Sequence, residues 1–298
     1  MKKPTFISGP EAAALIKDDS TIATIGMTLV SASETILKAI ENRFLETGSP
    51  HHLTLVHSCG QSDRDRGIQH FAHEGMLSRI IGGHWGLQPR MMELIAGNKI
   101  EAYCIPQGQF AQLYRSMAGG EPGKITKVGL GTFVDPRLEG GKMNELTKAA
   151  PDISDVITID GEEYMRYRPI PLDYCIIRGT YVDEDGNLTT DEEAMSLEVL
   201  PAVMACKKFG GKVLAQAKYK VKSGTLHPKR VTVPGIFIDN VVMCPDPDTD
   251  HRQTHSFAFD PAYCGDIKVP NTESDALELT LRKVIGRRAL MELTPDDV

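Results

Sequence analysis

The sequence has no long hydrophobic run and no cluster of basic residues. No apolar stretch approaches the roughly 20 residues that a membrane-spanning helix needs. Residues 1–6 lead into no apolar region of the kind that signal peptides contain. Acidic residues outnumber basic ones, which gives a formal net charge of −7. We therefore expect no membrane partner, no nucleic-acid partner and a cytoplasmic location.

Cysteine is scarce and dispersed. The six cysteines form no Cys-x-x-Cys pair. Cys104, Cys175 and Cys244 lie in or beside apolar, strand-like runs, where a thiol acts as a small hydrophobic group. We expect reduced cysteines rather than disulfides.

Nucleotide-binding motifs are also absent, since neither Gly-x-Gly-x-x-Gly nor Gly-x-x-x-x-Gly-Lys-Ser/Thr occurs. Two histidine pairs have spacings found in metal sites. His70 and His73 have no evident third ligand beyond Glu74, and residues 251–255 carry Arg252 where a zinc peptidase has glutamate. We expect solvated-loop and packing roles for the first pair and no metal at either.

Residues 21–41 are the most informative stretch. A β-branched run ends at Gly26, which allows a turn, and Ser31 or Ser33 can cap a following helix. Apolar residues then recur on one helix face, namely Ile36, Leu37, Ile40 and Phe44. In an open α/β sheet, ligands bind beyond the C-terminal strand ends, where free backbone N–H groups can bind an anion or an oxyanion. An ordinary structural turn is the alternative.

The pattern of strand, helix and strand continues through the first half and predicts a mostly parallel sheet. Further strands are expected at residues 53–57, 80–86, 100–108 and 128–136, and helices at 10–17, 89–96 and 109–117. Glycines stand at four strand ends: Gly26, Gly82-Gly83, Gly108 and Gly131. They indicate a cleft lined by backbone, or merely punctuation between elements.

The second half adds a decoration and more α/β units. A hairpin is expected around Asp160-Gly161, with strands at 174–177, 212–216 and 234–243 and a surface loop at 245–254. The helix expected at 192–209 should bury Ala194, Leu197, Leu200 and Met204.

We expect one α/β domain over residues 1–272 and a linker helix over 273–298. Ser274 is the expected N-cap of that helix, whose face carries Leu277, Leu281, Val284 and Ile285. The Leu-x-x-Asp-Asp pattern of residues 293–297 repeats that of residues 15–19. The repeat predicts that the helix leads toward a second, related half.

The chain resembles the N-terminal half of the family I CoA-transferases, particularly the fused acetate/propionate/acetoacetate type. The matching segments are Arg43-Phe-Leu-Glu-Thr-Gly-Ser-Pro50, Arg64-Asp-Arg-Gly67, His70-Phe71 with His73-Glu-Gly75, Ile81-Gly-Gly-His-Trp-Gly-Leu87, Asn98-Lys-Ile-Glu-Ala-Tyr103, Pro106-Gln-Gly108, Val128-Gly-Leu-Gly-Thr-Phe-Val-Asp-Pro136, Leu226-His-Pro228 and Val233-Pro-Gly-Ile236. They occur in order along nearly the whole chain, so the match is specific.

The resemblance implies two related open α/β halves with the active site between them, this chain being the α-like half. The nucleophilic glutamate belongs to the β-like half, fused or separate, so this chain alone should be inactive. The implied substrates are an acyl-CoA and a small carboxylate, with coenzyme A as a substrate rather than a permanent cofactor. The implied reaction is short-chain acyl or 3-oxoacid CoA transfer in a homo-oligomer, as in ketone-body and short-chain fatty acid metabolism.

The resemblance also implies roles for individual residues. Gln107 aligns with a residue close to the nucleophile, and Gly26 with a glycine-aromatic loop near the reacting carbonyl. Met27 stands where relatives carry Phe, so the acyl preference is expected to differ. Gly108, Gly131 and Thr132 are further expected substrate-binding residues.

Two other functions are compatible with the sequence. The chain could be a stand-alone domain that binds acyl-CoA or a small acid without catalysis. A thioester hydrolase is the weaker alternative, because no nucleophile and base can be paired, and Cys59 near His57 shows nothing beyond chance.

Overall fold

The computed structural model describes residues 3–270 and 278–297, which belong to two compact units, Met1–Asp266 and Ile267–Val298. All strands of the described residues lie in the first unit. No helix among the described residues is both long and apolar enough to cross a membrane.

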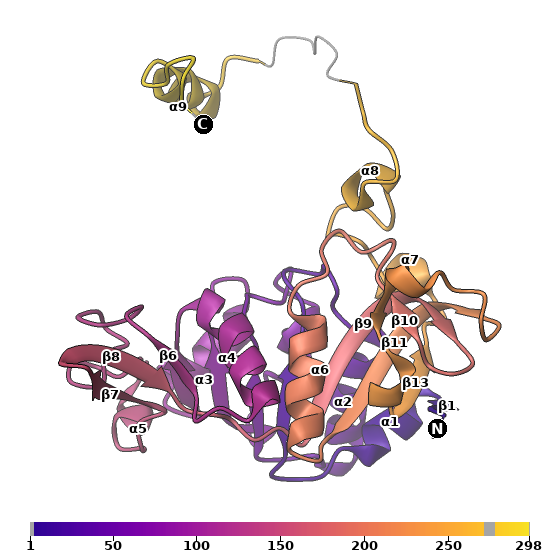
Figure 1. Ribbon diagram of the computed structural model, residues 1–298, viewed down its shortest axis with the longest axis horizontal. Coiled ribbons are helices and arrows are strands. Elements are labelled where there is room, and N and C mark those ends of the chain that lie inside the picture. The colour runs from indigo at the N-terminus through magenta and orange to yellow at the C-terminus, as the bar shows by residue number, and fades with distance from the viewer. Residues whose placement is uncertain (1–2, 271–277, 298) are drawn as a thin grey trace. The chain divides into compact units, whose positions relative to one another are not determined.

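The first unit is built on a ten-stranded sheet (Figure 1). Its eight main strands are parallel, in the order β1-β13-β11-β9-β2-β3-β4-β5, and the short β10 and β12 pair antiparallel beside β9. The strands are β1 (Thr5–Ile7), β2 (Thr21–Thr24), β3 (Leu53–Val56), β4 (Leu77–Gly82), β5 (Glu101–Cys104), β9 (Tyr174–Asp183), β10 (Leu188–Thr189), β11 (Lys212–Val221), β12 (Val231–Val233) and β13 (Asn240–Met243). The open, mostly parallel α/β fold is therefore confirmed.

Helices cover both faces of this sheet. One face packs against α1 (Gly9–Leu15), α2 (Glu34–Thr47), α3 (Pro89–Ala96) and the 3₁₀ helix η1 (Gly67–Phe71). The other face packs against α4 (Gln107–Gly119) and α6 (Val199–Lys208), which lie in front of the sheet in Figure 1. Ile22 belongs to the first core and Ala23 to the second, because successive strand side chains point to opposite faces.

The remaining elements are short. They are α5 (Glu145–Lys148), α7 (Pro247–Asp250), α8 (Pro261–Cys264), η2 (Pro228–Arg230) and η3 (Gly235–Phe237). The expected hairpin is present as β7 (Ser154–Ile159) and β8 (Glu162–Tyr167), and β6 (Lys124–Thr126) adds a third strand to it. This antiparallel sheet decorates the main one, as the change in periodicity predicts.

The helix expected after Gly26 is present as α2. Ser33 occupies its N-cap position, but the hydroxyl makes no capping hydrogen bond. Gly48 ends α2 in the left-handed conformation, with φ of 74°, which glycine adopts without strain. The strand-turn-helix prediction is confirmed, whereas the capping bond is absent.

The strand expected at residues 128–136 is wrong, because this segment is a series of turns. Gly129 and Gly131 have φ values of 105° and 70°, which a strand does not contain. The Gly131 N–H donates to Asp135 Oδ2 at 2.9 Å and closes one of the turns. Gly131 therefore does not stand at a strand end.

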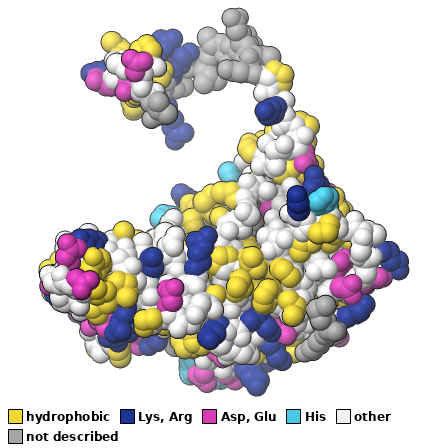
Figure 2. Space-filling model, in the orientation of Figure 1, with side chains coloured by type: hydrophobic (Ala, Val, Ile, Leu, Met, Phe, Trp, Pro, Cys, Tyr) yellow, Lys and Arg dark blue, Asp and Glu magenta, His cyan; other side chains and the backbone are white. Residues whose placement is uncertain are grey.

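The helix expected at 192–209 begins later, and its predicted inner face is wrong. Its buried side is formed by Val199, Ala202, Val203, Ala205 and Cys206. Met204 is 39% exposed, and Figure 2 shows hydrophobic side chains gathered on the surface over α6. Residues 192–198 stay outside the helix, and Glu193 there binds buried Arg178.

The expected surface loop at 245–254 is also wrong in part. It contains α7, and Asp250, His251 and Gln253 are buried. The segment is polar because its side chains bind other buried polar groups: His251 Nδ1 lies 3.3 Å from the amide nitrogen of Gln216, and Gln253 Nε2 donates to Glu192 O at 2.8 Å.

The second unit contains α9 (Leu281–Leu290), whose N-cap is Thr280 rather than the expected Ser274. Ser274 and Leu277 lie outside the described residues. The boundary between the two units falls after Asp266, whereas the expected boundary lies after residue 272. The role of residues 273–298 as a linker stays a prediction.

All six cysteines are free thiols. Cys175, Cys206 and Cys244 are buried, and burial raises the pKa of Cys206 to about 12. Cys104 is only partly buried. These thiols are unreactive at neutral pH, because the thiolate is the nucleophile.

Candidate active site

The C-terminal ends of four neighbouring strands bring four loops together. β2, β3, β4 and β5 are adjacent and parallel, so the chain leaves all four at one edge of the sheet. Gly26 follows β2, Gly60 and Gln61 follow β3, Gly83 follows β4, and Gln107 follows β5. We call these five residues the glycine row. It lies where ligands bind in open α/β sheets.

Another residue lies against the Cα of each glycine of the row. A Cβ atom on Gly26 would lie 2.0 Å from Gln61 Nε2, and one on Gly60 would lie 2.4 Å from His84 Nδ1. A Cβ on Gly83 would lie 2.5 Å from Gln107 Cγ. A Cβ at these positions would force its neighbours to shift, so the loops after the four strands are in close contact. A Cβ on Gly108 or Gly131, in contrast, would meet no atom within 4 Å.

Several N–H groups in the row make no hydrogen bond among the described residues. Within the described residues, the N–H groups of Gly26 and Gln107 donate to no acceptor, and neither does that of Gly108, which follows the row. Gln107 is the first residue of α4, two positions before the expected start, so its N–H and that of Gly108 lack helical acceptors. The row therefore offers donors and the positive end of a helix dipole.

Gln107 and Gly108 are exposed at the start of α4. Met27 lies in a tight turn, in which the Met27 N–H donates to Val30 O at 3.0 Å and the Thr28 N–H donates to Gly60 O at 2.7 Å. These bonds tie the loop after Gly26 to the loop after β3.

Gly131 and Thr132 are placed differently. Both are exposed in the turns after β6, and the Thr132 hydroxyl donates to Gly129 O at 2.8 Å. No hydrogen bond among the described residues joins them to Gly26 or Gln107. The structure thus places four of the six expected residues at one edge of the sheet, with the ends of β3 and β4 between Gly26 and Gln107, and leaves these two in a separate segment.

A buried ionic cluster that sequence reasoning missed holds the loop after Gly26. Arg178 of β9 donates to Glu193 Oε1 at 2.9 Å and Oε2 at 2.5 Å, and it also donates to Ala32 O at 3.0 Å. His251 Nε2 lies 3.1 Å from Glu193 Oε1. An arginine inside a β-branched strand, with acidic residues 15 positions later, was the only signal in the sequence.

Electrostatics fixes the charge states in this cluster. Burial alone would raise the pKa of Glu193, but Arg178 and His251 outweigh it, so the pKa is lowered and the carboxylate stays charged. Burial and the neighbouring Arg178 lower the pKa of His251 to about 4, so its imidazole is neutral at pH 7. A neutral imidazole can donate to Glu193 and accept from Gln216 at 3.3 Å.

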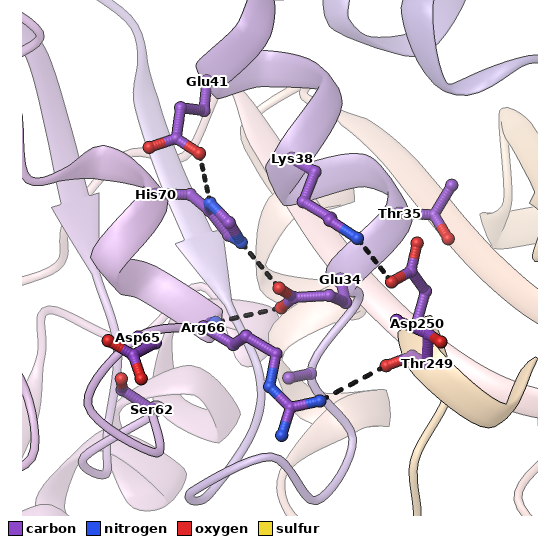
Figure 3. Close-up of polar contacts among 12 residues, drawn as sticks. Glu34, Thr35, Lys38, Glu41, Ser62, Asp65, Arg66, His70, Thr249 and Asp250 are labelled. Atoms are coloured by element: carbon purple, nitrogen blue, oxygen red, sulfur yellow. Dashed lines mark hydrogen bonds and ion pairs between the residues drawn. The ribbon is translucent and has the colours of Figure 1, made fainter. Parts of the chain in front are cut away.

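A second network anchors the other side of the β3 loop to α2 (Figure 3). The Gly67 N–H donates to Glu34 Oε2 at 2.9 Å, and His70 Nε2 lies 2.6 Å from Glu34 Oε1. Glu41 binds the other ring nitrogen of His70, and its Oε1 lies 2.6 Å from His73 Nε2. Burial lowers the pKa of His70, but both carboxylates raise it, and the net shift is upward.

The solvated role expected for the first histidine pair is therefore wrong for His70, which is buried between two carboxylates. Among residues 3–270 and 278–297, no group of three or more His, Cys, Asp or Glu side chains could hold a metal ion.

Buried glutamates beside the row are engaged within the fold. Glu34 binds Gly67 and His70, Glu193 binds Arg178, and Glu198 accepts a short hydrogen bond from Ser58. None of these three carboxylates is positioned as a free nucleophile.

A model of the coenzyme A transferase family matches residues 8–243. The chain belongs to this family, as the sequence resemblance indicates. Caffeate CoA-transferase of Acetobacterium woodii is 42% identical over 98% of this chain and 56% of that protein. The solved acyl-CoA transferase YdiF of Escherichia coli O157:H7, a thioester complex with CoA, has a TM-score of 0.87 and 36% identity over 97% of this chain and 57% of that one.

The α subunit of acetate CoA-transferase from Escherichia coli K12 is 26% identical over 81% of this chain and 97% of that subunit. The chain thus spans about half the length of its longer relatives. It also matches an α subunit along nearly the whole length of that subunit.

Proposed function

We propose that this chain is the α-like half of an acyl-CoA:carboxylate CoA-transferase that acts on short-chain acyl groups or 3-oxoacids. The observation that carries the proposal is the glycine row, where interlocked loops present unpaired N–H groups at the C-terminal strand ends. Its partners are an acyl-CoA, a small carboxylate and a β-like half, fused or separate, in a cytoplasmic homo-oligomer. Residues 273–298 are the proposed linker toward that half.

The proposed reaction is ping-pong, with a glutamate of the β-like half as nucleophile. The glutamate oxygen attacks the acyl-CoA carbonyl, and the thiolate of CoA leaves, which gives an acyl-glutamyl anhydride. The thiolate then attacks the glutamyl carbonyl and releases the carboxylate, which leaves a glutamyl-CoA thioester. A new carboxylate repeats these steps in reverse order and departs as its CoA thioester.

In this scheme the chain supplies donors for the developing oxyanions. The N–H groups of Gly26 and Gly108 would stabilise charge on the reacting carbonyls, and Gln107 would hold the nucleophile or the acyl group. Met27 would line the acyl site. Gly131 and Thr132 would reach the substrate from the turns after β6.

The position of the nucleophile can be tested by mapping the covalent intermediate. The native protein that contains this chain is incubated with acyl-CoA, and the CoA adduct is located by peptide mass spectrometry. We expect the adduct on a glutamate outside these 298 residues, because Glu34, Glu193 and Glu198 are bonded within the fold. An adduct on any glutamate of this chain would contradict the proposal.

Gln107→Ala tests the row itself. We expect it to lower kcat by about 10-fold or more in the assembled enzyme, since a donor near the reacting carbonyl is lost. The melting temperature should not change, because the side chain of Gln107 is exposed and makes no hydrogen bond among the described residues. Gln112→Ala, at another exposed position of α4, is the matched control and should leave kcat unchanged.

Unchanged kinetics in Gln107→Ala would remove this residue from the site. If the isolated chain binds CoA in calorimetry and no native partner or longer polypeptide shows transfer activity, the stand-alone binding domain is the better explanation.

A further inference from the structure

Gln61 is held rigidly through its backbone. It is 1% exposed, in the segment between β3 and η1. The Ile68 N–H donates to Gln61 O at 2.9 Å, and the Gln61 N–H donates to the side-chain oxygen of Gln88 at 3.0 Å. The carboxylate of Glu34, which accepts from the Gly67 N–H, fixes the far end of the same loop (Figure 3).

The side chain of Gln61, in contrast, makes no hydrogen bond with any other residue of 3–270 and 278–297. Its Oε1 atom is buried without a hydrogen bond, and Nε2 donates to no acceptor in the described part of the chain. Buried carboxamides nearly always form hydrogen bonds, because desolvation without compensation is unfavourable. An exception on an otherwise fixed residue points to a group that arrives from outside the fold.

The carboxamide of Gln61 lies at the β2 end of the glycine row, against Gly26. A Cβ on Gly26 would lie 2.0 Å from Gln61 Nε2, so the amide rests on the Gly26 backbone, whose own N–H is unpaired. The Gln61 carboxamide and the Gly26 backbone are thus in close contact. Rotation of the terminal torsion exchanges oxygen and nitrogen within nearly the same volume, so an N–H can be presented at either position.

We propose that Gln61 is a substrate-binding residue whose carboxamide donates to an oxygen of the acyl group. A carboxylate or a thioester carbonyl accepts and does not donate, which matches the N–H donors that the Gln61 carboxamide and the Gly26 backbone offer. The acyl oxygen belongs either to the free acid or to the acyl-CoA. This inference rests on the proposed CoA transfer, and it assigns the acyl group to one end of the row.

The first test compares two buried glutamines in the assembled enzyme. Gln61→Met keeps the side-chain length and removes the donor. Gln253→Met is the matched control, because Gln253 is 2% exposed but its amide is paired within the fold, donating to Glu192 O at 2.8 Å and accepting from the Asp260 N–H at 2.8 Å.

We expect Gln61→Met to lose about 10-fold or more in kcat/KM for both acyl donor and acid, with an unchanged or higher melting temperature, because no bond of the free protein is lost. Gln253→Met should lower the melting temperature and leave kcat/KM unchanged well below it. Wild-type kcat/KM in a folded Gln61→Met would overturn the proposal.

The second test needs no turnover. The side-chain amide signals of Gln61 are assigned in ¹⁵N-glutamine-labelled protein by their loss in Gln61→Met, and acetate, acetyl-CoA and CoA are then titrated. We expect a shift with acetate and acetyl-CoA. No shift with either, or one with CoA alone, would overturn the assignment.

The two tests separate the failures. A shift with acetate in a protein that transfers no CoA would sustain the Gln61 site and refute the proposed reaction. Transfer activity with no shift and normal Gln61→Met kinetics would sustain the reaction and refute the site.

Discussion

At the scale of single residues, His57 shows how burial sets a charge state. Trp85 Nε1 donates to its Nε2 at 3.0 Å, and its Nδ1 lies 2.8 Å from Cys59 O, so the ring is a neutral imidazole with the proton on Nδ1. Burial lowers the pKa of His57 to about 4. A Cβ on Gly82 would lie 2.4 Å from Nε2, so the ring packs beneath the β4 end of the row. The residue therefore supports the loops rather than acting as a base at pH 7.

This burial predicts a dependence of stability on pH. In the unfolded chain His57 takes up a proton below about pH 6.5, whereas in the folded chain it does so only near pH 4. The contribution of the neutral His57 ring to the free energy of unfolding is thus fully present above pH 6.5. It is lost as the pH falls toward 4, which lowers the free energy of unfolding by up to about 3 kcal/mol.

Urea denaturation across this range should show a shallower decline for His57→Gln than for the wild type. His255→Gln removes an exposed imidazole and should leave the decline unchanged. Equal slopes in all three proteins would mean that His57 is not the group responsible.

At the scale of elements, the loop between β2 and α2 depends on a strand that lies far away in sequence. Arg178 of β9 bonds carbonyl oxygens of Leu29 and Ala32, and the Ser31 hydroxyl donates to Glu193 at 3.4 Å. Thr28 and Ser31 have φ values of 52° and 59°, so the loop is strained where it passes this cluster. The cluster thus fixes residues 29–32 of the loop that follows Gly26.

Replacing one partner of the buried Arg178–Glu193 pair should therefore lower the free energy of unfolding more than replacing both partners. We expect Arg178→Met to lower the free energy of unfolding by about 3–5 kcal/mol, because Glu193 is left charged and buried. In urea denaturation, the double variant Arg178→Met/Glu193→Leu should recover part of that loss. A double variant as unstable as the sum of the single variants would show that the pair is not coupled.

At the scale of the whole molecule, the two units differ in what they bury. The first contains two apolar cores, one on each face of the sheet. In the second, no described residue is buried, and Leu281, Ile285 and Leu290 on α9 are more than half exposed. A helix of ten residues gains little stability without packing.

A chain that ends at Asp266 should consequently melt within about 2 °C of the full chain, since a loss below 1 kcal/mol moves the melting temperature by only a few degrees at this size. Thermal denaturation followed by circular dichroism checks this. A fall of about 10 °C or more would show that residues 267–298 stabilise the first unit.

Much of the fold was predictable because strand and helix patterns are local. The periodicity of α2, α3 and the β7–β8 hairpin is visible in the residues themselves, and Gly26 was correctly placed after a strand. The errors at 128–136 and 245–254 both came from reading structure from local composition. Turn glycines can follow apolar residues, and polar residues can be buried when distant partners bind them, so composition alone misleads.

By itself the sequence determined the alternation of elements, the parallel sheet and the strand-end glycines, since these depend on neighbours along the chain. Only the tertiary structure decided which side chain each glycine admits, because Gln61, His84 and Gln107 come from other loops. It alone also showed that Arg178 and Glu193 hold the loop after Gly26 and that the carboxamide of Gln61 is unpaired. Such facts depend on contacts between distant residues, and no local pattern specifies them.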